Sequence, residues 1–74
     1  MSNNDLLVRL FAAEMNPKSI REMRLHSGMK QKEFDEVIKH LLNIGYIKVT
    51  RYEYDEVGDQ IPAEYGPTEI ALKD

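Results

Sequence analysis

Five basic side chains fall within residues 18–32 and could hold phosphate groups. They are Lys18, Arg21, Arg24, Lys30 and Lys32. Lysine and arginine neutralise the phosphates of nucleic acids, and this contact supplies most of the nonspecific affinity of DNA-binding proteins. The spacing favours a phosphate-contacting patch. The alternative is an ordinary solvated helix face, in which Lys32 pairs with Glu36 four residues later.

Three tyrosines share the alternation of one expected strand. Tyr46, Tyr52 and Tyr54 have the same parity, opposite to that of Ile47 and Val49. They would line the outer face of the strand if the two aliphatic residues face a core. Tyrosine is enriched in interfaces, which predicts a contact surface for a second copy or another protein. Local cross-strand packing is the alternative, and a stacking platform for single-stranded nucleic acid is less favoured.

No pattern in the sequence indicates catalysis, a metal site or a cofactor. The 74 residues contain no cysteine, which excludes thiol catalysis and thiolate metal sites. His26 and His40 supply too few ligands for zinc. The carboxylates of residues 55–59 lack the spacing of a calcium-binding loop. Motifs for phosphate loops, nucleophilic serines and zinc proteases are also missing. We therefore expect a non-enzymatic protein with no cofactor, no metal and no small-molecule substrate.

The charge is divided between a basic part and an acidic part. Residues 1–51 carry nine basic and six acidic side chains, whereas residues 52–74 carry one basic and seven acidic ones, for a net charge of −3.

With 42% apolar and 31% charged residues, the chain is typical of one globular domain over residues 1–74. Its longest apolar run is four residues, and its start lacks the pattern of a signal peptide. We expect a cytoplasmic protein that makes no membrane contact.

Helical periodicity predicts three helices, over residues 5–15, 19–27 and 30–43. Asn16-Pro17 should end the first, because a residue before proline avoids the helical region. The second begins with the capping pattern Ser19-Ile20-Arg21-Glu22 and ends at Gly28. The third has the strongest apolar repeat, at Phe34, Val37, Ile38, Leu41 and Leu42.

Beyond Gly45 the pattern changes from helical periodicity to alternation. Residues 46–54 are rich in β-branched and aromatic types and predict a strand. Residues 55–62 predict a turn with Gly58-Asp59 at its tip. Residues 63–72 would return antiparallel, with a bulge or break at Gly66-Pro67. The expected fold is α+β, with three helices followed by a two-stranded antiparallel β-hairpin.

This order of elements resembles the winged helix-turn-helix superfamily. Residues 19–29, SIREMRLHSGM, are similar to its second helix and turn, where an apolar residue follows the glycine. Residues 30–42 are similar to its recognition helix. Residues 43–47, NIGYI, are similar to the junction at which a glycine precedes the first strand of the wing. The resemblance covers residues 5–72.

The resemblance implies a protein that binds double-stranded DNA and regulates transcription. The third helix would enter the major groove, where an amide such as that of Gln31 can pair with adenine. The groove-facing candidates are Lys30, Gln31, Lys32, Asp35, Glu36 and Lys39. The candidates for phosphate contact are Lys18, Arg21 and Arg24 on the second helix, and Lys48 and Arg51 on the wing strand.

Acidic residues favour a second interpretation, in which the chain is a protein-interaction module. Asp35 and Glu36 would lie close to phosphates, and residues 55–59 place no basic side chain at the tip of the wing. Winged helices also bind proteins, and here the acidic, tyrosine-rich hairpin would contact the partner. A third interpretation combines DNA binding by the helices with a homodimer formed through the hairpins, which would place two recognition helices about one helical turn apart.

Overall fold

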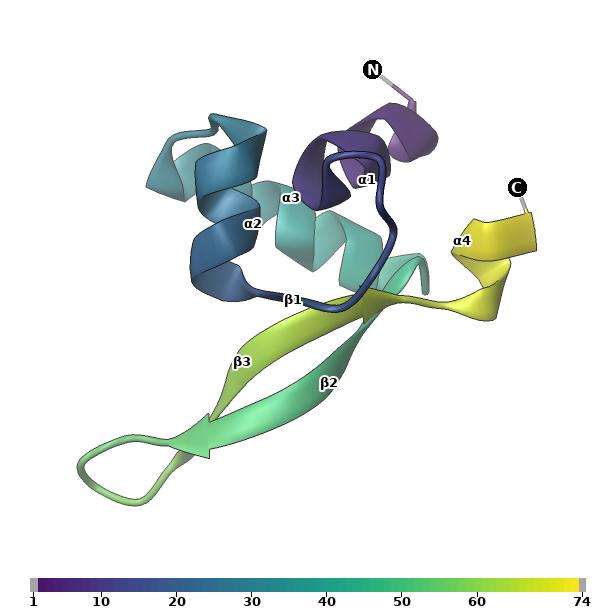
Figure 1. Ribbon diagram of the computed structural model, residues 1–74. Helices are drawn as coiled ribbons and strands as arrows, with labels where there is room; N and C mark the ends of the chain where they lie inside the picture. Colours follow the sequence, from purple (N-terminus) through teal and green to yellow (C-terminus); the bar gives the residue numbers. More distant parts are fainter. Residues whose placement is uncertain (1, 74) are drawn as a thin grey trace.

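The computed structural model describes residues 2–73. In chain order they form α1 (Asn3–Phe11), β1 (Lys18–Ser19), α2 (Ile20–Ser27), α3 (Gln31–Asn43), β2 (Ile47–Tyr54), β3 (Gln60–Pro67) and α4 (Glu69–Lys73). Helices α1, α2 and α3 lie on one side of the sheet, and the far end of the β2–β3 hairpin projects beyond them (Figure 1). The predicted α+β class is confirmed. The predicted number of elements is wrong, because residues 2–73 contain four helices and a three-stranded antiparallel sheet.

Serine side chains begin the first two long helices. The Ser2 hydroxyl accepts a hydrogen bond from the Asp5 amide at 3.2 Å, and the Asp5 carboxylate accepts one from the Ser2 amide at 3.3 Å. At α2, the Ser19 hydroxyl accepts from the Glu22 amide at 3.2 Å, which is the serine half of the predicted capping pattern. These bonds satisfy amide groups that have no partner within the first turn of a helix.

Left-handed residues end α1 and α2. Helix α1 stops at Phe11 rather than near residue 15, because Ala12 and Ala13 have φ angles of 49° and 67°. Gly28 ends α2 with a φ of 68°, which a glycine adopts without strain, and this agrees with the prediction. The Arg9 side chain then joins the two helices, since its Nε donates to the Ser27 carbonyl oxygen at 2.9 Å.

The sheet has the strand order β1-β3-β2, with both pairings antiparallel. Strand β1 was not predicted. It has only two residues, Lys18 opposite Tyr65 and Ser19 opposite Glu64, and two residues are too few to show alternation. The pairing of β2 with β3 is irregular around Arg51, between Val49 and Tyr52.

The last part of the chain differs from the prediction. Strand β3 starts at Gln60 and ends at Pro67, and residues 69–73 form α4 instead of continuing the strand. A side chain at Gly66 would lie 3.2 Å from Cγ of Pro17, so the glycine allows the base of the hairpin to pack closely against the loop before β1. The Thr68 amide donates to the Tyr46 carbonyl oxygen at 2.9 Å and closes this end of the hairpin.

One apolar core lies between the helices and the sheet. Its buried side chains are Leu7, Leu10, Phe11, Met23, Met29, Phe34, Ile38, Leu41, Ile47, Tyr65 and Ala71. The predicted inner face of α3 is therefore largely confirmed. Val37 is only partly buried, and Leu42 is exposed. Among residues 2–73, no helix is long and apolar enough to cross a membrane.

Candidate nucleic-acid interface

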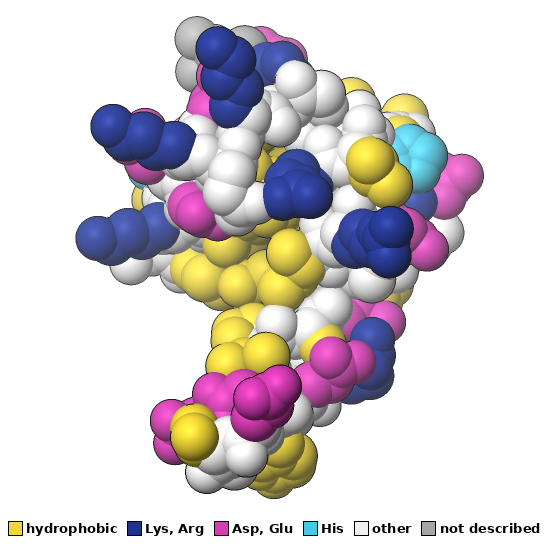
Figure 2. Space-filling view, turned by 90° about the vertical axis from the view of Figure 1, so that its left-hand side faces the viewer, with side chains coloured by type: hydrophobic (Ala, Val, Ile, Leu, Met, Phe, Trp, Pro, Cys, Tyr) yellow, Lys and Arg dark blue, Asp and Glu magenta, His cyan; other side chains and the backbone are white. Residues whose placement is uncertain are grey.

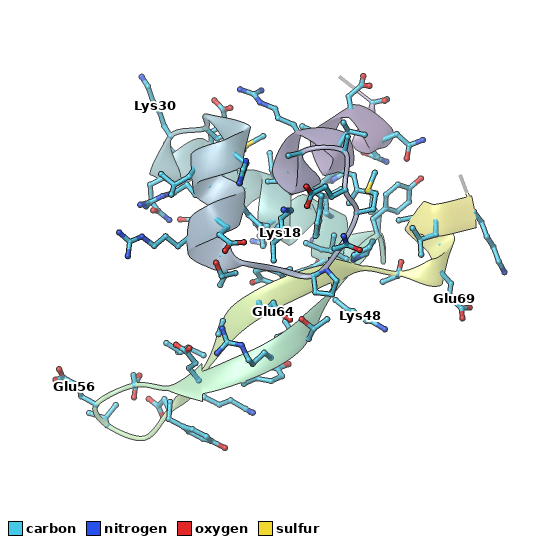
Figure 3. All side chains as sticks on the ribbon, viewed as in Figure 1. Lys18, Lys30, Lys48, Glu56, Glu64 and Glu69 are labelled. Atoms are coloured by element: carbon cyan, nitrogen blue, oxygen red, sulfur yellow. The ribbon has the colours of Figure 1, made fainter. Side chains whose placement is uncertain are left out.

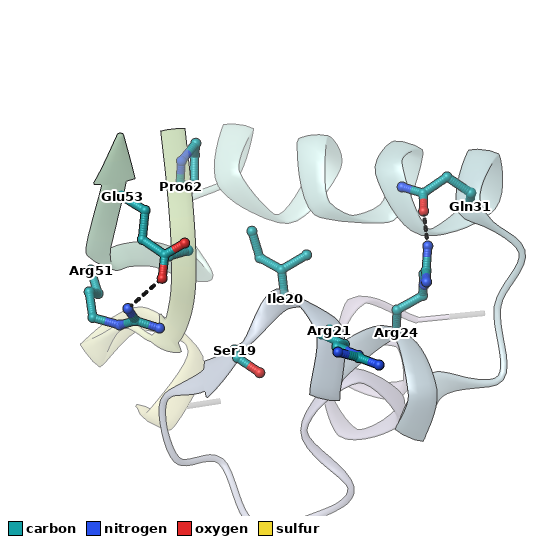
Figure 4. A pocket seen from close by; sticks show the side chains of 9 residues that line it. Ser19, Ile20, Arg21, Arg24, Gln31, Arg51, Glu53 and Pro62 are labelled. Atoms are coloured by element: carbon teal, nitrogen blue, oxygen red, sulfur yellow. Dashed lines mark hydrogen bonds and ion pairs between the residues drawn. The ribbon is translucent and has the colours of Figure 1, made fainter. Parts of the chain in front are cut away.

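A groove opens between α2, the start of α3 and the hairpin, with a volume of about 670 Å³. Ile20, Pro62 and Ala63 form its apolar part, and the polar side chains around it are those of Ser19, Arg21, Arg24, Gln31, Arg51 and Glu53. In Figure 4, Arg51 and Glu53 lie on the hairpin side, and Arg21 and Arg24 lie on the α2 side. The fold thus brings together four of the nine predicted DNA contacts, namely Arg21, Arg24, Gln31 and Arg51. We call this space the central groove.

A chain of polar contacts links the two helices at this groove. Arg24 Nη1 donates to Gln31 Oε1, and Gln31 Nε2 donates to Asp35 Oδ1 at 2.9 Å. Both polar atoms of the Gln31 amide are therefore engaged within the protein. To pair with an adenine edge, Gln31 must exchange these partners for the base. The network also places the Asp35 carboxylate next to the basic residues of the patch.

The charge of Arg51 is compensated within the hairpin. Its Nη1 lies 2.8 Å from Glu53 Oε1, and its Nε lies 3.9 Å from Glu64 Oε2. Half of the Arg51 side chain is exposed to solvent, so it borders the groove but carries its own counter-ions. By contrast, no ion pair within residues 2–73 involves Arg21 or Arg24.

A second groove, of about 240 Å³, lies between α3 and β3. Ile20 borders both grooves, and Lys39, which was predicted as a DNA contact, lies at this second one beside Asp35. Tyr65 also lines it. Burial raises the pKa of the Tyr65 phenol above its ordinary value of 10.0, and the neighbouring Tyr52 and Asp35 act in the same direction. The hydroxyl is therefore protonated at neutral pH. Tyr65 and Ile20 were not predicted as groove residues, although the alternation of residues 63–67 and the apolar stripe of residues 20–23 are signals in the sequence that could have indicated them.

Charge is segregated on the face that carries the grooves. Figure 2 shows lysine and arginine side chains around the upper part, an apolar hollow in the middle, and acidic side chains on the hairpin below. Lys30, the residue before α3, and Lys32 in the first turn of this helix are both exposed. Figure 3 shows Lys30 pointing outward from the protein. The exposed basic residues that lack an acidic partner at the groove, Arg21 and Arg24, come from α2, whereas the hairpin contributes Arg51 together with its partner Glu53.

Two predicted DNA contacts lie elsewhere. Lys18 belongs to β1 rather than to the second helix, is only 9% exposed, and has its Nζ 3.1 Å from Glu14 Oε2. Its placement on a phosphate-contacting helix face is therefore wrong. Lys48 is exposed but alternates with the buried Ile47, so it points away from the helices on the opposite face of the sheet (Figure 3).

The three tyrosines do not form one exposed face. Tyr46 precedes β2, is partly buried and packs against the core. Its assignment to the outer face of the hairpin is therefore wrong, because the Tyr46 amide donates to the Leu41 carbonyl oxygen at 2.9 Å and holds this segment against the end of α3. Tyr52 and Tyr54 are exposed, opposite Pro62 and Gln60.

Residues 2–73 contain no group of three or more histidine, aspartate or glutamate side chains that could hold a metal ion. Comparisons of the chain with protein-family models, with curated proteins and with solved structures find no match.

Proposed function

We propose that this protein is a winged-helix protein that binds double-stranded DNA and acts in transcriptional regulation. The observation that carries the proposal is the position of exposed basic side chains on two consecutive helices. Arg21 and Arg24 on α2, and Lys30 and Lys32 at the start of α3, are exposed, and none of the four forms an ion pair within residues 2–73. A helix-turn-helix uses these two elements in the same way, with one helix against the DNA backbone and the next in the major groove.

The roles of the residues follow from this arrangement. The first turn of α3 would lie in the major groove, with Gln31 exchanging its contact to Asp35 for a base edge. Arg21 and Arg24 would hold phosphates and fix the register of the protein on the duplex, because phosphate contacts position a protein without reading sequence. Lys39 lies about two turns further along α3 and would reach the edge of the major groove of the DNA.

The acidic residues limit affinity without excluding this function. The net charge of −3 arises mainly from residues 52–74, and the local charge at the helices is positive. A carboxylate such as Asp35 can accept a hydrogen bond from the amino group of cytosine. We therefore expect tight binding at physiological salt only to a defined DNA sequence, and strong nonspecific binding only at low salt.

A titration of a fluorescently labelled random-sequence duplex tests the proposal directly. Anisotropy should rise with protein concentration at low salt, and the affinity should fall steeply toward physiological salt. An unchanged anisotropy at low salt would overturn the proposal, because phosphate contact does not depend on finding the right site.

One observation favours a second function, that of a protein-interaction module. The end of the hairpin exposes apolar side chains among its carboxylates, with Tyr54 72% and Val57 80% accessible to solvent. Exposed aromatic and aliphatic side chains are typical of recognition surfaces. Under this alternative, replacing Tyr54 and Val57 by serine should abolish partner binding, and the wild-type protein should not bind the duplex.

A further inference from the structure

The end of the hairpin is an acidic arm that is held in a fixed shape. Residues 52–62 contain four carboxylates and no lysine or arginine, and all of them are exposed. The Asp55 carboxylate accepts hydrogen bonds from the amides of Val57 at 3.0 Å and Asp59 at 2.9 Å, which orders the turn. Within the described part of the chain, Asp55, Glu56 and Asp59 form no ion pair.

The central groove has the opposite charge. Arg21 and Arg24 border it, and neither forms an ion pair within residues 2–73. Its apolar part, at Ile20, Pro62 and Ala63, is open to solvent. Figure 2 shows this apolar hollow between the basic helices and the acidic arm. The groove therefore suits a partner that is acidic and partly apolar.

The tip of the arm, residues 55–59, cannot fill the groove of its own chain. The hairpin that carries it is a two-stranded ribbon whose pairing in β2 extends from Ile47 to Tyr54, and the base of the hairpin is fixed by β1 and by the close contact of Gly66 with Pro17. Figures 1 and 3 show its tip, at Glu56, pointing away from the helices. The acidic arm and the basic groove are complementary, but they can contact each other only between two molecules.

We propose that the acidic arm of one copy docks in the central groove of a second copy, and that the reverse contact forms at the same time. Opposite charges meet in both contacts, with Glu56 and Asp59 facing Arg21 and Arg24 of the second copy. The exposed Val57 and Tyr54 supply apolar surface to cover the floor of the groove. A two-fold pair uses each arm and each groove once and leaves neither open, which is the usual arrangement of a homodimer.

The pairing has a consequence for DNA, and this consequence alone rests on the proposed function. The arm of the second copy would cover Arg21 and Arg24, the side chains that would otherwise hold phosphates. The arm would then act as an acidic substitute for the DNA backbone, and dimer formation and DNA binding would compete. Protein concentration and salt would set the balance between the two states.

Sedimentation equilibrium of the full chain, without DNA, tests the pairing. The wild-type protein should be a dimer at low salt and dissociate in about 500 mM salt, where charge interactions are screened within a few ångströms. Two charge-reversal variants are compared with it, the arm variant Glu56→Lys/Asp59→Lys and the groove variant Arg21→Glu/Arg24→Glu. Each alone should dimerise roughly tenfold or more weakly, because every dimer contains the changed contact twice.

An equal mixture of the two variants is the decisive sample. In the mixed pair, the lysine arm faces the glutamate groove, and the unchanged arm faces the unchanged groove, so a heterodimer should form where neither variant pairs with itself. Glu69→Lys, a charge reversal on α4, is the control and should dimerise as the wild type does. Circular dichroism checks folding, and Arg21→Glu replaces the double groove variant if that one loses helix.

Three results would overturn the pairing: a wild-type monomer at low salt, variants that dimerise as the wild type does, or a mixture that stays monomeric. None of these measurements contains DNA. A failure here therefore leaves the DNA titration unaffected, and a failure of that titration leaves the pairing intact.

Discussion

The proposed DNA binding has a salt dependence that can be worked out from the positions of the basic side chains. Nine residues were predicted as contacts. Lys18 is buried against Glu14, Lys48 lies on the opposite face of the sheet, and Arg51 is paired with Glu53. Gln31 is uncharged, and Lys39 lies at the second groove beside Asp35. The remaining candidates for phosphate contact are Arg21, Arg24, Lys30 and Lys32.

Four phosphate contacts define a measurable slope. Each neutralised phosphate contributes about −0.9 to the slope of log affinity against log salt, so four contacts give about −3.6 and a loss of roughly 150-fold between 50 and 200 mM salt. Removing one contact should reduce the slope to about −2.7 and the loss to roughly 40-fold over the same interval. Arg21→Ala and Lys32→Ala each remove one of the four, from α2 and α3 respectively.

Anisotropy titrations at several salt concentrations measure these slopes. Lys73→Ala is the matched control, because it removes an exposed positive charge from α4, far from the groove. Its slope should equal that of the wild type. Equal slopes for the wild type, Arg21→Ala and Lys32→Ala would refute the assignment of both residues. A slope close to zero for the wild type would refute phosphate contact by the helices altogether.

Three further predictions concern stability and charge. Phe34 is 2% exposed, so Phe34→Ala should lower the free energy of unfolding by about 3–5 kcal/mol in urea titrations, and an unchanged midpoint would show that the core is misassigned. Glu36→Gln should strengthen nonspecific DNA binding at low salt, since it removes a negative charge from the exposed face of α3; equal affinity would place this side chain away from phosphate. Because the pKa of the Tyr65 phenol is raised in the folded protein, the unfolded chain loses the phenol proton at a lower pH than the folded protein does. The free energy of unfolding should therefore fall as the pH rises above 10.0, and it should fall less in Tyr65→Phe. Identical pH profiles of unfolding for the two proteins would contradict this.

Local signals were enough to predict several features of the fold. The cap at Ser19 and the left-handed Gly28 depend on residues within one helical turn, and both appear as expected. The inner face of α3 was predictable because 13 residues give the apolar repeat more than three turns to appear. The prediction of this face is clearly wrong only at Leu42, which is exposed. Leu42 lies on the edge of the face and borders the second groove.

Features that depend on pairing across the chain were not predictable in this way. Strand β1 forms because Lys18 and Ser19 pair with residues 64 and 65 of β3, and no local sequence pattern indicates this pairing. The same pairing buries Lys18, which explains why a lysine assigned to a basic surface lies beside Glu14 instead. Helix α4 has only five residues, too few for a helical repeat, and the alternation of Thr68, Ile70 and Leu72 imitated a strand.

The hairpin places its charges so that it can add little to DNA affinity. Arg51 borders the central groove, but Glu53 borders it too and lies 2.8 Å from Arg51. A phosphate that approached this part of the hairpin would meet a neutral pair, and beyond it the carboxylates of residues 55–59. Under the proposed function, affinity for DNA would therefore come from α2 and α3. The acidic arm of the hairpin is then available to contact a basic surface on another molecule. Helices α2 and α3 of a second copy provide such a surface in any solution of this protein.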